Sequence, residues 1–175
     1  TYIPVIDALE RLSTEGADFR LSMSVSPCLC EMLADPLLQS RFERRLDNLR
    51  AFCREELERT SQDPDFHRTA KANASRLERA HQLYHDAYGR DLIAAFRRLQ
   101  DAGVLEIHTC AATHGMLPLF SHPKAVRAQL SQAVRNYEKH FRRPPAGIWL
   151  PECAYVEGLD QELARGGLKH VFLDS

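Results

Sequence analysis

Glu152 lies where a short apolar strand is expected to end, between the chain's single Trp, Trp149, and Tyr155. Residues 147–150 form an apolar run, and Pro151 has no N–H for a neighbouring strand, so the strand should stop there. In parallel sheets and barrels, reacting groups gather just past the carboxyl ends of the strands. A carboxylate beside aromatic rings suits chemistry on a sugar, because the rings pack on its apolar faces. A loop Glu can equally cap the next helix.

Polar residues also follow the other predicted strands, which we expect at residues 19–25, 104–109 and 168–173. These residues are Ser24, Ser26, His114 and Asp174. Small side chains precede His114, and small side chains let a backbone approach a ligand closely. Because the carboxyl ends of parallel strands meet on one face, we expect His114, Glu152 and Asp174 to share one site.

The helices that must position these strands have clear start signals. Asp35-Pro36 and Asp63-Pro64 each combine an N-cap Asp with a Pro that suits the first helical turn. Two long, highly charged helical segments follow, and we expect them to form a hairpin inserted at about residues 31–90, with solvated charged faces. Further helices are predicted at residues 4–12, 92–99, 123–141 and 159–163, with Asp91 and Ser121 as caps for two of them.

The alternation of short apolar strands with helices predicts an α/β fold with a parallel sheet or barrel. The chain has 175 residues, of which 44% are hydrophobic, so residues 1–175 are long enough for one globular domain. The net charge is −1 and no basic stripe appears, which argues against nucleic acid as a partner. No apolar run reaches the length of a membrane span, so no membrane partner is expected.

The five cysteines form no CxxC motif, and free thiols in a reducing cytoplasm are the simplest interpretation. We expect neither a cofactor nor a metal. A metal site would require His108, Cys110, His114 and Glu152 to converge, which would suggest a deacetylase-like barrel instead. His108 is expected to form a hydrogen bond within the core or between strands. His81 and His85, four residues apart on the helical segment, are expected at the surface.

Two segments resemble glycoside hydrolase family 57, and within it the branching enzymes that act on 1,4-α-glucan. They are Thr109-Cys110-Ala111-Ala112-Thr113-His114-Gly115 and Gly147-Ile148-Trp149-Leu150-Pro151-Glu152-Cys153-Ala154-Tyr155. Residues 137–145 and the opening residues 1–4 are also similar to that group, so the resemblance covers essentially the whole chain.

The resemblance implies part of an incomplete (β/α)7 barrel of parallel strands with a helical insertion. It implies a retaining enzyme in which Glu152 is the nucleophile and His114 and Trp149 bind the sugar. Tyr155 is either a stacking platform for sugar or a core aromatic, and Asp174 is a lesser candidate for lining the site. The substrate implied is an α-1,4-glucan of the glycogen or amylose kind. Cys110 and Cys153 are assigned no role beyond packing.

The family's first His motif is expected before Thr1, and its acid/base Asp beyond Ser175. Residues 1–175 are therefore expected to be part of a longer enzyme and inactive alone. The main hypothesis is formation of α-1,6 branches through a covalent intermediate on Glu152. One alternative is α-amylase-type hydrolysis at the same site. The other is a non-catalytic glucan-binding or helical interaction module built around residues 36–88.

Overall fold

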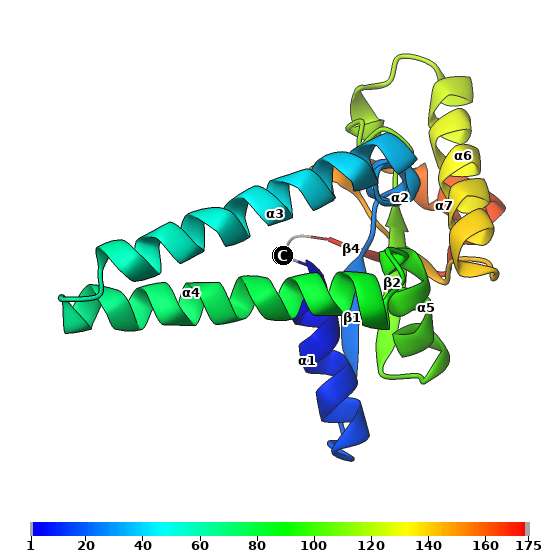
Figure 1. Cartoon of the computed structure of the whole chain (residues 1–175). Helices are drawn as coiled ribbons and strands as arrows, with labels where there is room; N and C mark the ends of the chain where they lie inside the picture. The colour runs from blue at the N-terminus through cyan, green and yellow to red at the C-terminus, as the bar shows by residue number, and fades with distance from the viewer. Residues whose placement is uncertain (1, 174–175) are drawn as a thin grey trace. The chain divides into compact units, whose positions relative to one another are not determined.

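The computed structural model describes residues 2–173 (Figure 1). By its internal contacts the chain forms two compact units. One consists of Thr1–Glu15 and Leu33–Ala95, and the other of Gly16–Met32 and Phe96–Ser175. Asp174 lies outside the described residues, so its predicted place in the site is not part of the structural account.

The second unit contains a parallel four-stranded sheet in the order β1-β2-β3-β4. Its strands are β1 (Leu21–Ser24), β2 (Leu105–Cys110), β3 (Gly147–Trp149) and β4 (His170–Phe172). Helix α6 (Pro123–Phe141) connects β2 to β3, and α7 (Leu159–Arg165) connects β3 to β4 (Figure 1). Strand and helix alternate as the hydrophobic pattern predicts, so the α/β class with parallel strands is confirmed.

A buried apolar cluster joins α6 and α7 to β3 and the end of β2. Its members are Ala111, Leu117, Val126, Leu130, Ile148, Leu150, Leu159, Leu163 and Leu168. On α6, Tyr137 is also fully buried, and its hydroxyl donates a hydrogen bond of 2.8 Å to the carbonyl of Ile107 in β2. Gln100 of α5 (Leu92–Asp101) donates in turn to the Tyr137 hydroxyl, so this buried polar group is satisfied within the core.

The register of the sheet places side chains in rows across β2, β3 and β4. Cys110 pairs with Trp149, and Trp149 pairs with Phe172. Two residues earlier on each strand, and so on the same face, Gly147 pairs with His170. The register of β2 and β3 places His108 opposite Gly147 in this second row. The row that contains Cys110, Trp149 and Phe172 therefore lies nearest the carboxyl ends of the strands.

The first unit contains helix α1 (Tyr2–Thr14), α3 (Pro36–Arg59) and α4 (Pro64–Gln82), which continues into a short π-helix, η1 (Leu83–Ala87). The predicted caps Asp35 and Asp63 are confirmed, because Asp35 accepts a hydrogen bond of 2.8 Å from the N–H of Leu38 and Asp63 accepts one of 3.3 Å from that of Phe66. That the segment around these helices is an insertion stays a prediction.

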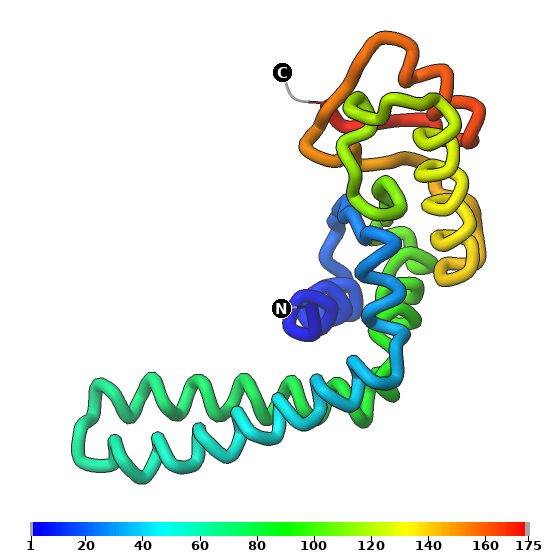
Figure 2. Tube along the Cα trace, turned by 90° about the horizontal axis from the view of Figure 1, so that it is seen from above, coloured from blue at the N-terminus to red at the C-terminus, as the bar shows by residue number. Residues whose placement is uncertain are grey.

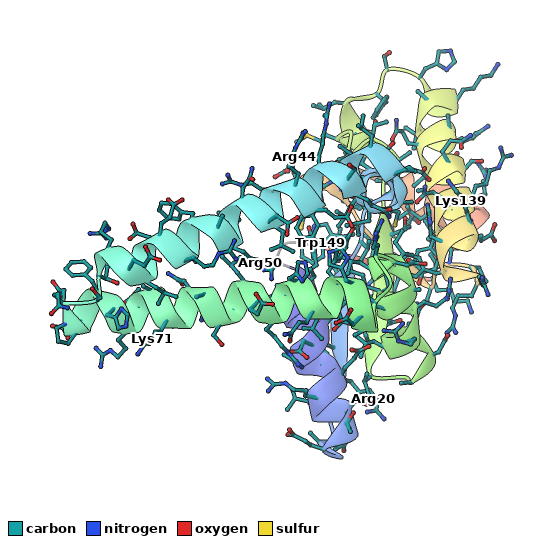
Figure 3. All side chains as sticks on the ribbon, viewed as in Figure 1. Arg20, Arg44, Arg50, Lys71, Lys139 and Trp149 are labelled. Carbon is teal, nitrogen blue, oxygen red and sulfur yellow. The ribbon has the colours of Figure 1, made fainter. Side chains whose placement is uncertain are left out.

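Helices α3 and α4 run side by side as a hairpin (Figure 2). Arg50 of α3 reaches α4, where its guanidinium donates two hydrogen bonds, of 2.9 and 3.0 Å, to the carboxylate of Glu78 (Figure 3). Such a bidentate pair fixes the register of two charged helices more firmly than single contacts do.

Helix α2 (Pro27–Ala34) is not among the helices expected from the sequence, which predicts a strand at residues 19–25 and no helix directly after it. The Ser26 hydroxyl accepts a hydrogen bond of 3.2 Å from the N–H of Leu29, and Pro27 starts the helix, so the pair is also a helix start. The predicted cap Ser121 is wrong, because α6 begins after His122, whose side chain makes no capping hydrogen bond. Among residues 2–173, no helix combines the length and the apolar character needed to cross a bilayer.

Candidate active site

Glu152 lies in a sharp turn immediately after β3. The strand ends at Trp149, and Pro151 opens a short 3-10 turn, η3 (Pro151–Cys153). Glu152 has φ 56° and ψ 25°, and Cys153 has φ 51°, so two successive non-glycine residues are left-handed. This conformation is costly for side chains with a Cβ and is found disproportionately at functional sites. The turn leaves the Glu152 side chain 70% exposed at the edge of the sheet.

His114 follows β2 in a comparable turn and comes close to Glu152. It has φ 58°, and its N–H donates a hydrogen bond of 2.9 Å to the carbonyl of Ala111. Its Nε2 lies 3.8 Å from Oε1 of Glu152, which is longer than a hydrogen bond but within the range of an ion pair. The structure thus brings together two of the predicted site residues, which are 38 positions apart in the sequence.

Cys110 holds the other side of the His114 ring, which the sequence did not reveal. Its Sγ lies 3.0 Å from Nδ1 of His114. Burial raises the pKa of the Cys110 thiol to about 11, so the thiol keeps its hydrogen at neutral pH. When the His114 ring is neutral, that thiol can donate to Nδ1, and in this arrangement the ring hydrogen sits on Nε2, facing Glu152. The sequence offers one hint of this contact: Cys110 and His114 are four residues apart.

The loop between β2 and His114 is held from two directions. Gln129 of α6 accepts a hydrogen bond of 2.9 Å from the N–H of Thr113 and donates one of 2.9 Å to its hydroxyl. The thiol of Cys28 in α2 donates to the carbonyl of Ala112 at 3.2 Å. These contacts order the backbone immediately before His114, as a preorganised binding group requires.

The two aromatic candidates differ in their surroundings. Trp149 stacks on Phe172 of β4, with ring centroids 5.3 Å apart and planes 25° apart, and remains 41% exposed. Tyr155 is 44% exposed, so it is not a core aromatic. Its hydroxyl donates to Asp160 at 3.1 Å, and this hydrogen bond raises the pKa of Tyr155. Both rings keep surface on which a sugar can pack.

The alternative metal set of His108, Cys110, His114 and Glu152 does not form. His108 is buried and instead contacts His170 of β4, with an Nε2–Nε2 distance of 2.6 Å. The prediction that His108 forms a hydrogen bond between strands is thereby confirmed.

The sequence profile described as "Glycosyl hydrolase family 57" matches residues 1–175. The chain belongs to glycosyl hydrolase family 57. The resemblance seen in the two motifs is therefore confirmed across the whole chain.

Three similar proteins bear on the activity. A protein of Thermococcus kodakarensis, named "1,4-alpha-glucan branching enzyme TK1436", is 35% identical over 192 residues, which cover 100% of this chain and 28% of that protein. The solved structure of the "novel alpha-amylase AmyC" from Thermotoga maritima is 40% identical with a TM-score of 0.94, covering 100% of this chain and 33% of its own. The solved structure of a "GH57-type branching enzyme" from Pyrococcus horikoshii is 34% identical with a TM-score of 0.92. The match covers 98% of this chain and 35% of that chain. The chain thus spans about a third of the length of these three proteins.

Proposed function

We propose that this chain carries the nucleophile of a retaining site that acts on α-1,4-glucan and forms α-1,6 branches. The observation that carries the proposal is the exposed carboxylate of Glu152, 3.8 Å from His114, at the carboxyl end of β3 in a family 57 chain. The similarity to proteins named 1,4-α-glucan branching enzymes supports the choice of substrate.

In the proposed reaction, a carboxylate oxygen of Glu152 attacks the anomeric carbon and the bond to the leaving oxygen breaks. A second carboxyl group gives its proton to that oxygen; in retaining enzymes it lies about 5–5.5 Å from the nucleophile. We expect it to be an Asp beyond Ser175. A glucan 6-hydroxyl then attacks the glycosyl-enzyme, loses its proton to the same Asp and releases Glu152.

The neighbouring residues would orient the sugar. A neutral His114 whose hydrogen is on Nε2 can donate a hydrogen bond to a sugar hydroxyl beside Glu152. The exposed surface of Trp149 would pack on an apolar sugar face, and Tyr155 offers a second such surface. We place the reaction in the cytoplasm, where the five cysteines, all free in the structure, would remain reduced.

Hydrolysis by the same site is the second candidate, and the similarity to an α-amylase structure favours it. Water would then attack the glycosyl-enzyme in place of the glucan hydroxyl. The ratio of the two products depends on how well the site excludes water and holds the acceptor.

The experiment compares the full-length protein with its Glu152→Gln variant on amylose and scores both new α-1,6 branch points and released reducing ends. We expect Glu152→Gln to lower both by at least about 1,000-fold. Glu157→Gln is the matched control, because Glu157 is an exposed carboxylate of the same loop. Branch points should dominate in the wild type; a dominance of reducing ends would make the protein a hydrolase.

A second measurement tests the covalent step directly. A fluorinated glycosyl substrate that slows turnover should leave a glycosyl mass on the peptide that contains Glu152. Activity retained in Glu152→Gln, or a label on another residue, would remove Glu152 from the mechanism. Unchanged glucan binding in a protein that never forms either product would favour a non-catalytic binding module.

A further inference from the structure

A second polar cluster lies on the same three strands, one row away from Trp149. Glu106 and His108 project from β2 and His170 from β4. The Nε2 atoms of the two histidines are 2.6 Å apart. The Glu106 carboxylate faces both, with one oxygen 3.7 Å from Nε2 of His108 and the other 3.8 Å from Nε2 of His170. Within residues 2–173, this is the one group of at least three His, Cys, Asp or Glu side chains whose possible metal-ligand atoms all lie within 4.8 Å of one another.

Gly147 of β3 creates the space in which the two rings meet. Strand β3 separates β2 from β4, so the imidazoles must reach each other across it. A Cβ on Gly147 would collide with the ring of His170 and would lie 2.9 Å from Cδ2 of His108. Glycine is therefore the residue that lets donor atoms from β2 and β4 converge at this point.

The distances to the carboxylate fit a shared ion better than a hydrogen bond. Both exceed the 2.7–3.2 Å of a normal N–H···O bond. Zinc binds imidazole nitrogen and carboxylate oxygen at about 2.0–2.2 Å with tetrahedral geometry, so two of its ligands lie about 3.3–3.5 Å apart. The carboxylate is already near that separation. The Nε2 atoms of His108 and His170 would need to move apart by about 0.7 Å for Zn²⁺ to replace the hydrogen bond between them.

We propose that Glu106, His108 and His170 form a Zn²⁺ site with a water molecule as the fourth ligand. Two imidazoles and one carboxylate are a ligand set that suits zinc and not Mg²⁺ or Ca²⁺, which prefer oxygen. The side chains of Glu106 and His170 are 50% and 40% exposed, so an ion can reach these two ligands from solvent.

The ion would tie β2 to β4 beneath the aromatic row. His108 packs edge-on against Phe172 with centroids 4.9 Å apart, and Phe172 stacks on Trp149. The site would therefore stabilise the sheet and fix the ring that precedes Glu152. It takes no part in the glycosyl-transfer steps and does not depend on the proposed activity.

The test uses the full-length protein, stripped of metal with a chelator and titrated with Zn²⁺ alone by calorimetry, with bound metal measured by mass spectrometry. We expect a single tight Zn²⁺ per chain, a higher melting temperature with Zn²⁺ than without it, and visible absorption bands of a tetrahedral site when Co²⁺ replaces Zn²⁺. Mg²⁺ should produce none of these effects.

Variants locate the site. His108 is buried, so substitution there tests folding as much as binding; Glu106→Gln and His170→Gln are preferred because both side chains are partly exposed. Each should weaken Zn²⁺ binding by more than about 100-fold, beyond the effect of removing a residue that merely supports a ligand. Circular dichroism verifies that both variants remain folded.

The matched control is the double substitution His81→Gln and His85→Gln. This second pair of neighbouring histidines has ring centroids 4.5 Å apart and lies on a different part of the chain. The control should bind Zn²⁺ as tightly as the wild type. Absence of tight binding, binding that survives in both Glu106→Gln and His170→Gln, or binding lost in the control would each overturn the proposal.

Discussion

The sulfur of Cys110 lies 3.0 Å from Nδ1 of His114, on the side of the ring opposite to Glu152. Because burial raises the pKa of this thiol to about 11, the thiol is neutral and can donate its hydrogen to Nδ1. A residue assigned only to packing from the sequence therefore contacts the ring nitrogen of His114 that faces away from Glu152. We interpret Cys110 as a positioning residue for His114.

Cys110→Ala should reduce kcat for glucan about tenfold, because one hydrogen bond of about 1–1.5 kcal/mol no longer orients His114. KM should change little. Cys110→Ser should recover most of the lost rate, since a hydroxyl can donate to the same nitrogen. The measurement is steady-state kinetics of the full-length variants. Equal rates in the Ala and Ser variants would show that Cys110 acts through packing volume alone.

The left-handed turn at Glu152 should cost stability. At φ 56°, the left-handed backbone costs an alanine about 1 kcal/mol more conformational free energy than it costs a glycine. The Glu152→Gly variant should therefore be more stable than Glu152→Ala by about that amount. Both should lack glycosyl transfer. Arg142, at φ 59° after α6, is the matched position away from the site. Its Gly and Ala variants should differ in the same direction and keep activity.

Urea unfolding measures these differences. An alanine variant as stable as its glycine counterpart at both positions would contradict the view that the turn is strained.

Gly147→Ala should destabilise the protein by about 1–3 kcal/mol, the usual cost of forcing an extra group into a packed site. The added methyl group would collide with His170 and crowd His108. In a double-mutant cycle measured by urea unfolding, His170→Ala should remove much of that cost, because it empties the space above the strand. Additive effects of the two substitutions would show that the glycine is needed for a different reason.

Glu31 should make stability depend on acid pH. Its carboxylate in α2 accepts hydrogen bonds from Lys139 and His140 of α6, which hold its pKa below the ordinary value of 4.5. Because the pKa of Glu31 is lower in the folded than in the unfolded protein, its carboxylate stabilises the fold at any pH above the unfolded-state pKa. This stabilisation is lost as the pH falls through the folded-state pKa. The group is half exposed, so we expect less than about 1 kcal/mol.

Urea unfolding of the wild type and Glu31→Gln between pH 3 and pH 7 checks this. The wild type should be the more stable at pH 7, and the difference should shrink towards pH 3. Glu157→Gln serves as the control. A difference that stays constant over the whole range would mean that the ion pair does not supply it.

Much of the fold could be predicted because its signals are local. The Asp-Pro pairs at residues 35 and 63 mark helix starts by capping their own first turns, and apolar runs mark all four strands. Helix α2 was missed because Ser26-Pro27 can both end a strand and start a helix. The cap expected at Ser121 is wrong because the N-cap residue is His122, whose side chain makes no capping hydrogen bond.

By itself, the sequence determined the family, the α/β class and the two candidate residues, Glu152 and His114, because each depends on a contiguous motif or on local periodicity. Only the tertiary structure decided that Cys110 orients His114 and that His108 meets His170 above Gly147. The second pair is separated by 62 residues, and its contact depends on which positions of parallel strands lie level. Strand register is set by packing of the whole sheet, so no local pattern specifies that meeting.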